Sequence, residues 1–261
     1  MALSDNLIHY YNFDEASGDL IDQVGTNDGT VTGCTYSDIG KINTAYGFDG
    51  NDHIAIDEAG LDGASAFSVS VWIFKHTEAS YDTILGAIGD GTNKFGYMAT
   101  NAGKLWFRWV INSTEATAIL GATELDTGVW YHVVFWYDGT NTRIYLNGNS
   151  TPDAQGTSSG VVTIDGDIWF GANPFSLGIN WYDGHIDECG IWTRALTTAE
   201  ISELYNSGSG LPYPFTIPTN LQLNIADDWK VVDAIKINIG DTWKAVEGMQ
   251  INIGDSWKVI F

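Results

Sequence analysis

Large apolar residues recur at every second position in many short segments of this chain. Segment 67–74 shows this period most clearly, and segments 104–111 and 130–137 either share it or are almost wholly aromatic and β-branched. Turn-forming pairs such as Asn147-Gly148 separate the segments. This pattern is typical of short strands, so it predicts an all-β sandwich or barrel of about a dozen strands.

One helix is predicted, and it directly follows the last of these strands. Segment 184–192 alternates like a strand, so its adjacent Asp187 and Glu188 are expected to face opposite sides. Thr197 is a candidate N-cap, and Glu200 stands three residues further on, as a capping box requires. The segment therefore predicts a strand followed by a short helix that closes the domain.

The pattern changes after residue 208. Residues 209–219 are rich in proline, which favours a stiff, extended linker. Residues 220–261 then repeat the pattern Asn-Ile-(Ala/Gly)-Asp-x-Trp-Lys at a 14-residue step, and Gly-Asp suits a tight hairpin turn. The chain is therefore divided into a domain over 1–208, a linker over 209–219 and three 14-residue β-hairpin repeats over 220–261.

A thin sheet built from such hairpins has little core of its own. The repeats are therefore expected to pack on copies of themselves, and a homo-oligomer is predicted, with a trimer favoured. Packing on the first domain or on a different partner stays open. The predicted oligomerisation residues are the three tryptophans that recur in register: Trp229, Trp243 and Trp257.

Charge narrows the choice of partners. The 261 residues include 33 Asp and Glu but only 11 Lys and Arg, which gives a net charge of −22. Such a surface repels phosphates, so no nucleic-acid partner is expected, and no apolar run of about 20 residues predicts membrane insertion. The first residues show no basic region followed by an apolar run, so no signal peptide is expected. Cys34 and Cys189 are either two buried thiols or one disulfide.

The last strand and helix also carry a resemblance. The pattern Gly-x-Ile-Asp-Glu-x-x-Ile-Trp-x-Arg-Ala-Leu, which begins at Gly184, resembles the closing segment of laminin-G-like, concanavalin A-like jelly-roll domains. Segments 10–14, 45–50, 67–73 and 130–148 agree with the same family in order. The resemblance implies a two-sheet antiparallel jelly-roll sandwich with neighbouring first and last strands. The repeated tail resembles C-terminal segments of tailed-phage structural proteins.

Many jelly rolls of this type hold a structural calcium where the first and last strands meet. The resemblance places Asp14 and Asp187 at the family's carboxylate positions and Gly50 in a segment that supplies a backbone carbonyl, and Asp52 is a further candidate. Carboxylates, carbonyls and water together are the oxygen ligands that Ca²⁺ prefers. The alternative is that these carboxylates only cap turns.

Aromatic residues provide two candidate sets for sugar binding. The first lies in the loop over 173–184 and the second lies on one strand. Aromatic rings stack on sugar faces, whereas the alternative for each ring is ordinary core packing. The candidate ligand-binding residues are Phe175, Asn180, Trp181 and Tyr182 in the loop, and Trp106 and Arg108 on the strand. The tryptophans interpreted as core residues are Trp72, Trp130, Trp136 and Trp192.

No pattern in the sequence predicts catalysis. The chain has no Glu-x-Asp-x-x-Glu motif of the kind that related jelly-roll enzymes use. The five histidines have no metal-ligand spacing, and no nucleophile elbow, P-loop or dinucleotide fingerprint occurs. The chain is therefore predicted not to be an enzyme.

These observations lead to one functional hypothesis. The chain is interpreted as a non-enzymatic virion structural protein of a phage, which displays a jelly-roll adhesion or carbohydrate-binding module and is assembled or anchored by its repeats. The expected partners are copies of itself, other virion proteins and host surface glycans. The expected location is the virion surface, in capsid or tail, and otherwise extracellular. The alternatives are a decoration or fibre protein without a ligand, and a polysaccharide-active enzyme.

Overall fold

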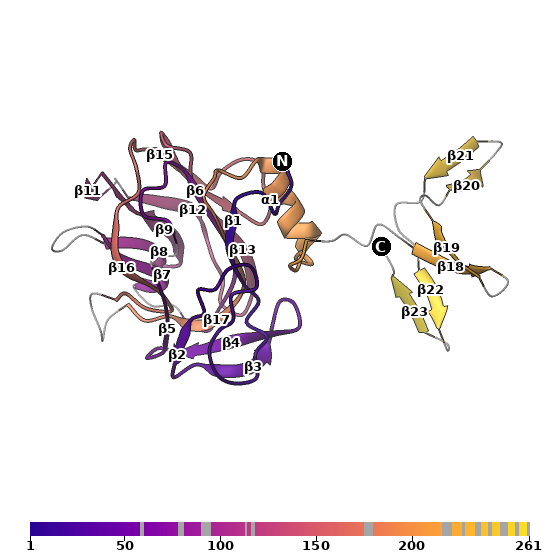
Figure 1. Cartoon of the computed structure of the whole chain (residues 1–261), viewed down its shortest axis with the longest axis horizontal. Helices are drawn as coiled ribbons and strands as arrows, with labels where there is room; N and C mark the ends of the chain where they lie inside the picture. Colours follow the sequence, from indigo (N-terminus) through magenta and orange to yellow (C-terminus); the bar gives the residue numbers. More distant parts are fainter. Residues whose placement is uncertain are drawn as a thin grey trace. The chain divides into compact units, whose positions relative to one another are not determined.

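The computed structural model confirms the all-β architecture (Figure 1). It describes residues 1–57, 60–77, 81–89, 95–112, 114–115, 118–174 and 180–215, together with six strands between residues 221 and 259. The chain divides into two units, Met1–Phe215 and Thr216–Phe261. The first unit extends beyond residue 208 because Tyr213 and Phe215 pack on it.

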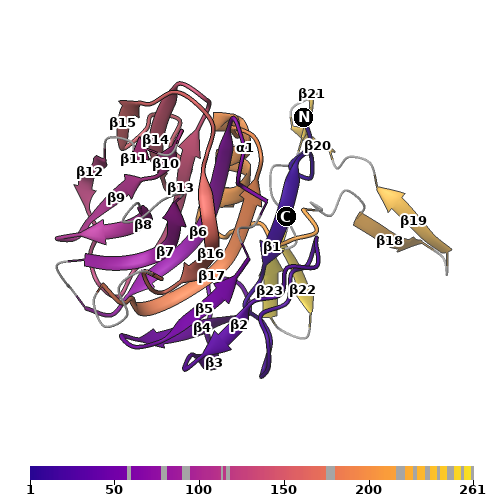
Figure 2. The same ribbon diagram turned by 60° about the vertical axis from the view of Figure 1, so that its left-hand side comes forward.

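The first unit is a sandwich of two antiparallel sheets, which Figure 2 shows from a second side. The eight-stranded sheet has the order β15-β14-β13-β6-β17-β4-β3, and β1 pairs with β17 beside this path. The seven-stranded sheet has the order β12-β9-β8-β7-β16-β5-β2. The first and last strands are therefore neighbours, as the family resemblance implied.

The strands of the eight-stranded sheet are β1 (Leu7–Tyr11), β3 (Thr35–Ile39), β4 (Thr44–Asp49), β6 (Phe67–Lys75), β13 (Trp130–Tyr137), β14 (Asn141–Leu146), β15 (Ala154–Thr157) and β17 (Asp183–Trp192). The strands of the seven-stranded sheet are β2 (Thr30–Thr32), β5 (His53–Ile56), β7 (Tyr81–Gly89), β8 (Phe95–Asn101), β9 (Lys104–Arg108), β12 (Ile119–Glu124) and β16 (Ile164–Phe170). A separate short pair consists of β10 (Val110–Ile111) and β11 (Thr114–Glu115).

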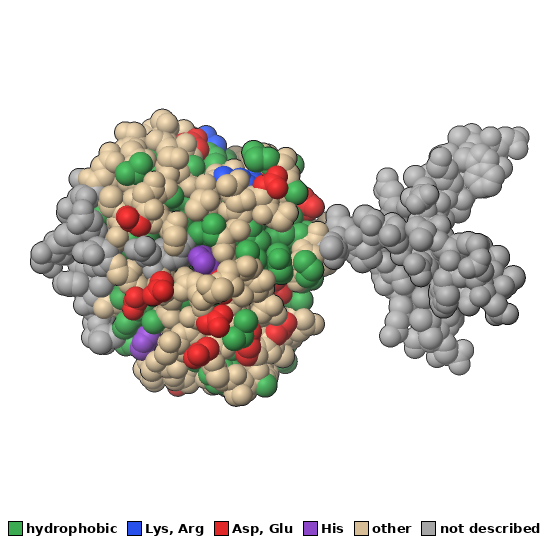
Figure 3. Space-filling model, viewed as in Figure 1, with side chains coloured by type: hydrophobic (Ala, Val, Ile, Leu, Met, Phe, Trp, Pro, Cys, Tyr) green, Lys and Arg blue, Asp and Glu red, His purple; other side chains and the backbone are tan. Residues whose placement is uncertain are grey.

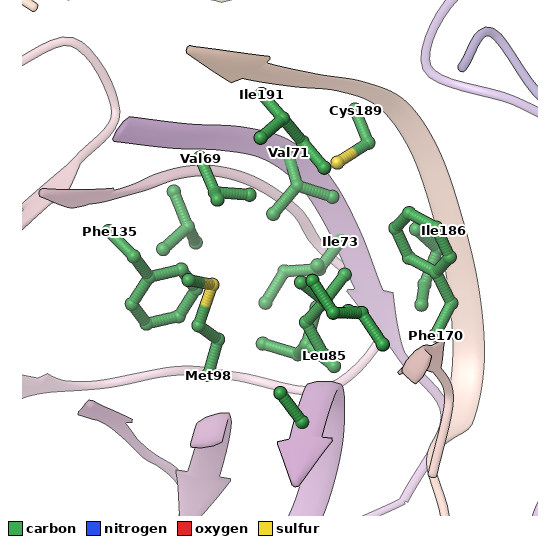
Figure 4. Close-up of a cluster of buried hydrophobic side chains, with 14 of the residues drawn as sticks. Val69, Val71, Ile73, Leu85, Met98, Phe135, Phe170, Ile186, Cys189 and Ile191 are labelled. Atoms are coloured by element: carbon green, nitrogen blue, oxygen red, sulfur yellow. The ribbon is translucent and has the colours of Figure 1, made fainter. Parts of the chain in front are cut away.

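Apolar side chains from the inner faces of both sheets fill the space between them. On β6 the predicted alternation is confirmed, since Phe67, Val69, Val71 and Ile73 belong to the core between the sheets, whereas Ser68 accepts from Leu196 of the outer cluster. Figure 4 shows Val69, Val71 and Ile73 in one cluster with Met98 of the opposite sheet. Burying each large apolar side chain stabilises the fold by about 1.5–3 kcal/mol relative to leaving it exposed.

A second apolar cluster lies on the outer face of the eight-stranded sheet, under helix α1 (Thr198–Tyr205). The predicted capping box is confirmed, because the Thr197 side chain accepts from the Glu200 N–H and the Glu200 carboxylate accepts from the Thr197 N–H. The Trp192 indole N–H donates to the Leu3 carbonyl over 2.7 Å, which ties the chain start to this cluster. No helix in the described part of the chain is long and apolar enough to cross a membrane.

A β-bulge interrupts β17 and corrects one prediction. Asp187 faces Trp72 and Gly190 faces Ser70, so three steps on β17 match two steps on β6. Glu188 adopts a φ of 49° at this point. As a result, Ile186 and Cys189 point into the same core, as Figure 4 shows. Asp187 and Glu188 thus stand together between two core positions, and the Glu188 carboxylate accepts from Tyr10 of the outer cluster, so the expectation that they face opposite sides is wrong.

Other predictions on this unit have mixed outcomes. Cys34 and Cys189 are free and buried, so the alternative of two buried thiols is confirmed. Trp72, Trp136 and Trp192 are buried as predicted. Trp130 is only partly buried and lies against the ring of Phe74, with 5.5 Å between the ring centroids.

The described strands of the second unit form three two-stranded hairpins. In each, an asparagine pairs with a tryptophan at the same place in the repeat: Asn224 with Trp229, Asn238 with Trp243 and Asn252 with Trp257. The strands are β18 (Leu221–Ile225), β19 (Asp228–Val232), β20 (Lys236–Ile239), β21 (Thr242–Ala245), β22 (Gln250–Ile253) and β23 (Ser256–Val259).

Candidate functional site

The outer face of the seven-stranded sheet carries a row of side chains that the core does not use. Strand register places Ala55, Trp169, Gly86, Tyr97 and Arg108 side by side across five neighbouring strands. Their neighbours along the strands belong to the core between the sheets, so these positions lie on the outer face. Gly86 and Tyr97 are themselves buried there, whereas Arg108 is partly exposed.

Four residues at one end of this face form an aromatic platform, which we define as Tyr81, Tyr97, Trp106 and Arg108. The rings of Tyr97 and Trp106 stack with centroids 5.3 Å apart and planes 21° apart, and Tyr81 lies 5.5 Å from Trp106. The Arg108 guanidinium lies over Tyr97 at 5.1 Å and over Trp106 at 5.5 Å. The neighbouring Leu120 is 50% exposed, so the platform opens to solvent on the β12 side.

The structure thus places the predicted pair Trp106 and Arg108 together on a solvent-facing surface. Sequence reasoning missed Tyr97 and Tyr81, which strand register brings beside them. Tyr97 faces Arg108 directly across the β8–β9 pair. Its hydroxyl accepts a 2.8 Å hydrogen bond from the Asn173 side chain, which fixes the ring from the opposite side.

Trp181 and Asn180, two of the predicted loop residues, lie apart from the platform. Trp181 lies against His53, with ring centroids 6.0 Å apart, and His53 stacks on Trp169 at 4.0 Å. Asn180 has a φ of 63°, and its carbonyl accepts from the Thr83 N–H over 3.1 Å. These contacts form a second aromatic group on the same sheet, beside β5 and β16. Phe175 lies outside the described residues.

One member of the loop set is corrected. Tyr182 is fully buried, and its hydroxyl donates to the carbonyls of Phe74 and His185. The prediction that it contacts a ligand is therefore wrong, because its ring belongs to the core between the sheets.

The loop separates the platform from the second aromatic group. A Cβ atom at Gly86 would lie only 2.7 Å from the Ala172 carbonyl oxygen and 3.1 Å from the Asn173 Cα atom. Residues 172–174 therefore cross the sheet at the one position of the row that has no side chain. These residues therefore border the platform on one side.

The carboxylates predicted to bind calcium fall into two places. Asp14 accepts hydrogen bonds from the Thr44 N–H and hydroxyl, and one oxygen of Asp187 accepts from the Ile42 N–H at 3.0 Å. Both carboxylates thus accept from residues 42–44, so they lie in one region. Asp52 instead accepts from the Asp49 N–H beside Gly50, in the turn between β4 and β5.

Glu188 is a third carboxylate near Asp14 and Asp187 that the prediction did not include. Its side chain accepts a short hydrogen bond from the Tyr10 hydroxyl. Burial and the Glu188 charge raise the pKa of Asp187 to about 9, and burial with the Asp14 charge raises the pKa of Glu188 to about 8. Both groups are therefore held in their protonated form near neutral pH when no cation is present.

Part of this region fits a hard cation. One oxygen of Asp187 and the side-chain oxygen of Asn12 are buried and have no hydrogen-bond partner among the described residues. Oxygen atoms of this kind are the donors that Ca²⁺ accepts. The described residues nevertheless contain no group of three or more His, Cys, Asp or Glu side chains placed to hold a metal ion. Asp14 and Asp187 thus fit the expectation in part, and Asp52 and Gly50 do not join them.

A family comparison decides what kind of domain carries these features. The model of the concanavalin A-like lectin/glucanases superfamily matches residues 48–202, more than half of the chain. The chain belongs to this superfamily. No curated protein sequence matches the chain.

Solved structures agree with the lectin/glucanase fold. Domain 4 of an extracellular arabinanase from Geobacillus stearothermophilus, solved with arabinotriose, is 25% identical with a TM-score of 0.60, and the match covers 76% of this chain and 97% of that one. The binding domain of Paraclostridial mosquitocidal protein 1 is 14% identical with a TM-score of 0.64, covering 97% and 72%. The receptor-binding domain of botulinum neurotoxin D is 17% identical with a TM-score of 0.60, covering 84% and 55%. The two toxin domains support the fold alone.

The buried carboxylates of this lectin-like domain generate a prediction about pH. Unfolded Asp and Glu have pKa values of about 3.9 and 4.3, far below the folded values, so the folded state holds two protons that unfolding releases. The free energy of unfolding is therefore expected to fall as pH rises from about 4 to about 9 in metal-free buffer. Glu188→Gln keeps an acceptor for Tyr10 and removes one of these titrations. Urea unfolding of this variant between pH 6 and 9.5 should show a smaller decrease in the free energy of unfolding than the unmodified protein shows.

Glu203→Gln is the matched control, because Glu203 is exposed on helix α1. Its free energy of unfolding should change with pH in the same way as that of the unmodified protein. Equal pH slopes for Glu188→Gln and the unmodified protein would contradict the assignment.

Proposed function

We propose that this chain is a non-catalytic glycan-binding module whose ligand lies on the aromatic platform. The observation that carries the proposal is the position of Trp106, between Tyr97 and Tyr81 and under Arg108, on the solvent side of the sheet. Aromatic faces stack on the apolar faces of sugar rings, and a guanidinium offers several fixed donors for hydroxyl groups. Residues 172–174, which border the platform, offer the ligand a further contact surface.

Two further observations support this proposal. The 25% identical arabinanase domain was solved with arabinotriose, so a relative of similar size is known with a bound oligosaccharide. In addition, the adjacent acids Asp187 and Glu188 are 0% and 4% exposed, so a substrate cannot reach them as a catalytic pair. Binding without bond cleavage is the simpler use of such a surface.

Trp106→Ala tests the platform. Removing the ring removes the stacking contact, which contributes about 0.5–1.5 kcal/mol beyond burial, so affinity should fall roughly tenfold. Isothermal titration with arabinotriose, together with the best binder from a glycan array, measures the change. Trp130→Ala is the matched control, because Trp130 is partly buried on the other sheet. Equal affinities of Trp106→Ala and the unmodified chain would contradict the proposal.

We further propose that Asp14, Asp187 and the side-chain oxygen of Asn12 hold a structural Ca²⁺ ion. The buried, unpartnered oxygens of Asp187 and Asn12 support this, since a cation would satisfy both and offset the cost of three neighbouring carboxylates. Excess CaCl2 should raise the melting temperature relative to EDTA at pH 8, and Asp187→Asn should abolish the increase. Identical melting curves in CaCl2 and EDTA would refute the site.

We also propose that the repeats assemble the chain into a homo-oligomer that displays the module on a virion. Two-stranded hairpins are marginal on their own, and the three hairpins pair only within themselves among the described strands, which supports the need for a partner. The regular 14-residue step would let equivalent hairpins of several copies pack in the same way.

Light scattering of the whole chain and of residues 1–215 tests this assembly. The truncated chain retains both apolar clusters of the first unit, so it should fold, and circular dichroism checks this. We expect a trimer for the whole chain and a monomer for the truncation. The same oligomeric state for both would show that the repeats do not assemble the protein.

A further inference from the structure

The outer face of the eight-stranded sheet brings two histidines from distant parts of the sequence into contact. His185 lies on β17, where it pairs with Phe74 of β6, and His76 follows the end of β6. The His76 N–H donates to the Asp183 carbonyl over 3.0 Å, which extends the β6–β17 pairing to this point. The two imidazole centroids are 4.7 Å apart, with the rings almost perpendicular at 82°.

Each imidazole lies beside a carboxylate, and His76 is hydrogen-bonded to its own. The Nδ1 atom of His76 lies 3.1 Å from Asp183, and the Nε2 atom of His185 lies 3.4 Å from Asp38. Asp183 is held in turn, because it accepts a 2.8 Å hydrogen bond from the Thr77 hydroxyl. A carboxylate that accepts from one ring nitrogen leaves the other nitrogen with its lone pair, which is the usual arrangement behind a metal-bound histidine.

The surroundings keep both carboxylate–imidazole pairs in place. A Cβ atom at Gly47 would lie 2.3 Å from the Asp38 carboxylate, so this glycine makes room for Asp38 beside His185. The ring of Phe74 stacks on His185 at 5.3 Å with planes 17° apart. Burial and the neighbouring His76 lower the pKa of His185, and the charge of Asp38 raises this pKa by a smaller amount. A neutral imidazole is the form that binds a metal ion.

We propose that His76 and His185 form a binding site for a divalent cation of the zinc class, with Asp183 and Asp38 as positioning residues. The ligating atoms are the Nε2 atom of His76 and the Nδ1 atom of His185. Imidazole nitrogen suits Zn²⁺, Cu²⁺ and Ni²⁺, whereas Ca²⁺ and Mg²⁺ require oxygen ligands. This site is therefore chemically distinct from the carboxylate region at Asp14 and Asp187.

The number of ligands decides how such a site behaves. The described residues contain no group of three or more His, Cys, Asp or Glu side chains placed around one metal position, so the protein supplies two nitrogens and water completes the coordination. A site of this kind binds its metal exchangeably and keeps open positions. The side chains of His76 and Asp183 are 40% and 30% exposed, so the metal can enter from solvent.

Titration of the whole, tag-free chain with ZnCl2 tests the proposal by calorimetry, after dialysis against EDTA and then chelator-free buffer. We expect one zinc per chain, and no heat from this site with CaCl2. His76→Asn and His185→Asn should each remove the binding. Asp183→Asn should weaken it by about tenfold to a hundredfold, because only the orientation and basicity of His76 change. His53→Asn is the matched control, since His53 lies on the other sheet, and it should bind zinc normally.

Three results would overturn the proposal. The first is the absence of zinc binding to the unmodified chain. The second is unchanged zinc affinity in His76→Asn, a variant at an exposed side chain that should fold normally. The third is equal loss in His53→Asn, which would place the metal elsewhere. Circular dichroism of every variant separates loss of the site from loss of the fold.

Discussion

A strand offers only two edges for hydrogen bonding, and β17 needs three neighbours. It pairs with β6 along one edge, while its other edge serves β4 over its first residues and β1 over its last. The change of partner falls at the bulge between Asp187 and Gly190, where the strand gains one residue. Strand β1 can therefore pair with β17 only beyond the point where the pairing with β4 ends. The closure of the whole sandwich depends on this exchange.

The bulge also explains why the side chains of Asp187 and Glu188 are buried. The extra residue turns Glu188 to the same side as Asp187, between the outer cluster and the loop that begins β4. Two carboxylates in that position destabilise the sandwich unless they are protonated or neutralised by a cation. Figure 3 shows further acidic side chains spread over the face that carries β1 to β4, so cations are attracted to this side of the molecule.

The two outer faces of the sandwich differ because only one is covered. Helix α1, the N-terminal residues and Tyr213 with Phe215 cover the end of the eight-stranded sheet near Trp192. The other end of that sheet keeps Phe74 and the histidines at the surface. In the described part of the chain, residues 172–174 cross the seven-stranded sheet at Gly86, and Tyr81, Trp106 and Trp169 stay at least partly exposed beside them.

Local patterns predicted the elements well, and contacts between distant residues decided the rest. Alternation identified the core face of β6, and Thr197 with Glu200 identified the helix start, because both signals depend on a few adjacent residues. A period of two cannot reveal an inserted residue, so the bulge at Glu188 was missed. Tyr182 was assigned to a ligand because its loop is polar, yet the ring is buried by Phe48 and Phe74 from other strands.

The first and last residues of the sandwich are held close together, and this affects how the domain can be joined to other proteins. The Arg194 side chain donates to the carbonyls of Ala2 and Asp5, and Leu3 shares the outer cluster with Leu211 and Phe215, so the first and last residues of this unit lie in one cluster. A domain whose entry and exit coincide can be spliced into a surface loop of another protein without stretching its host. The sandwich therefore has the geometry of a domain that a loop of another protein can accommodate as a single insertion.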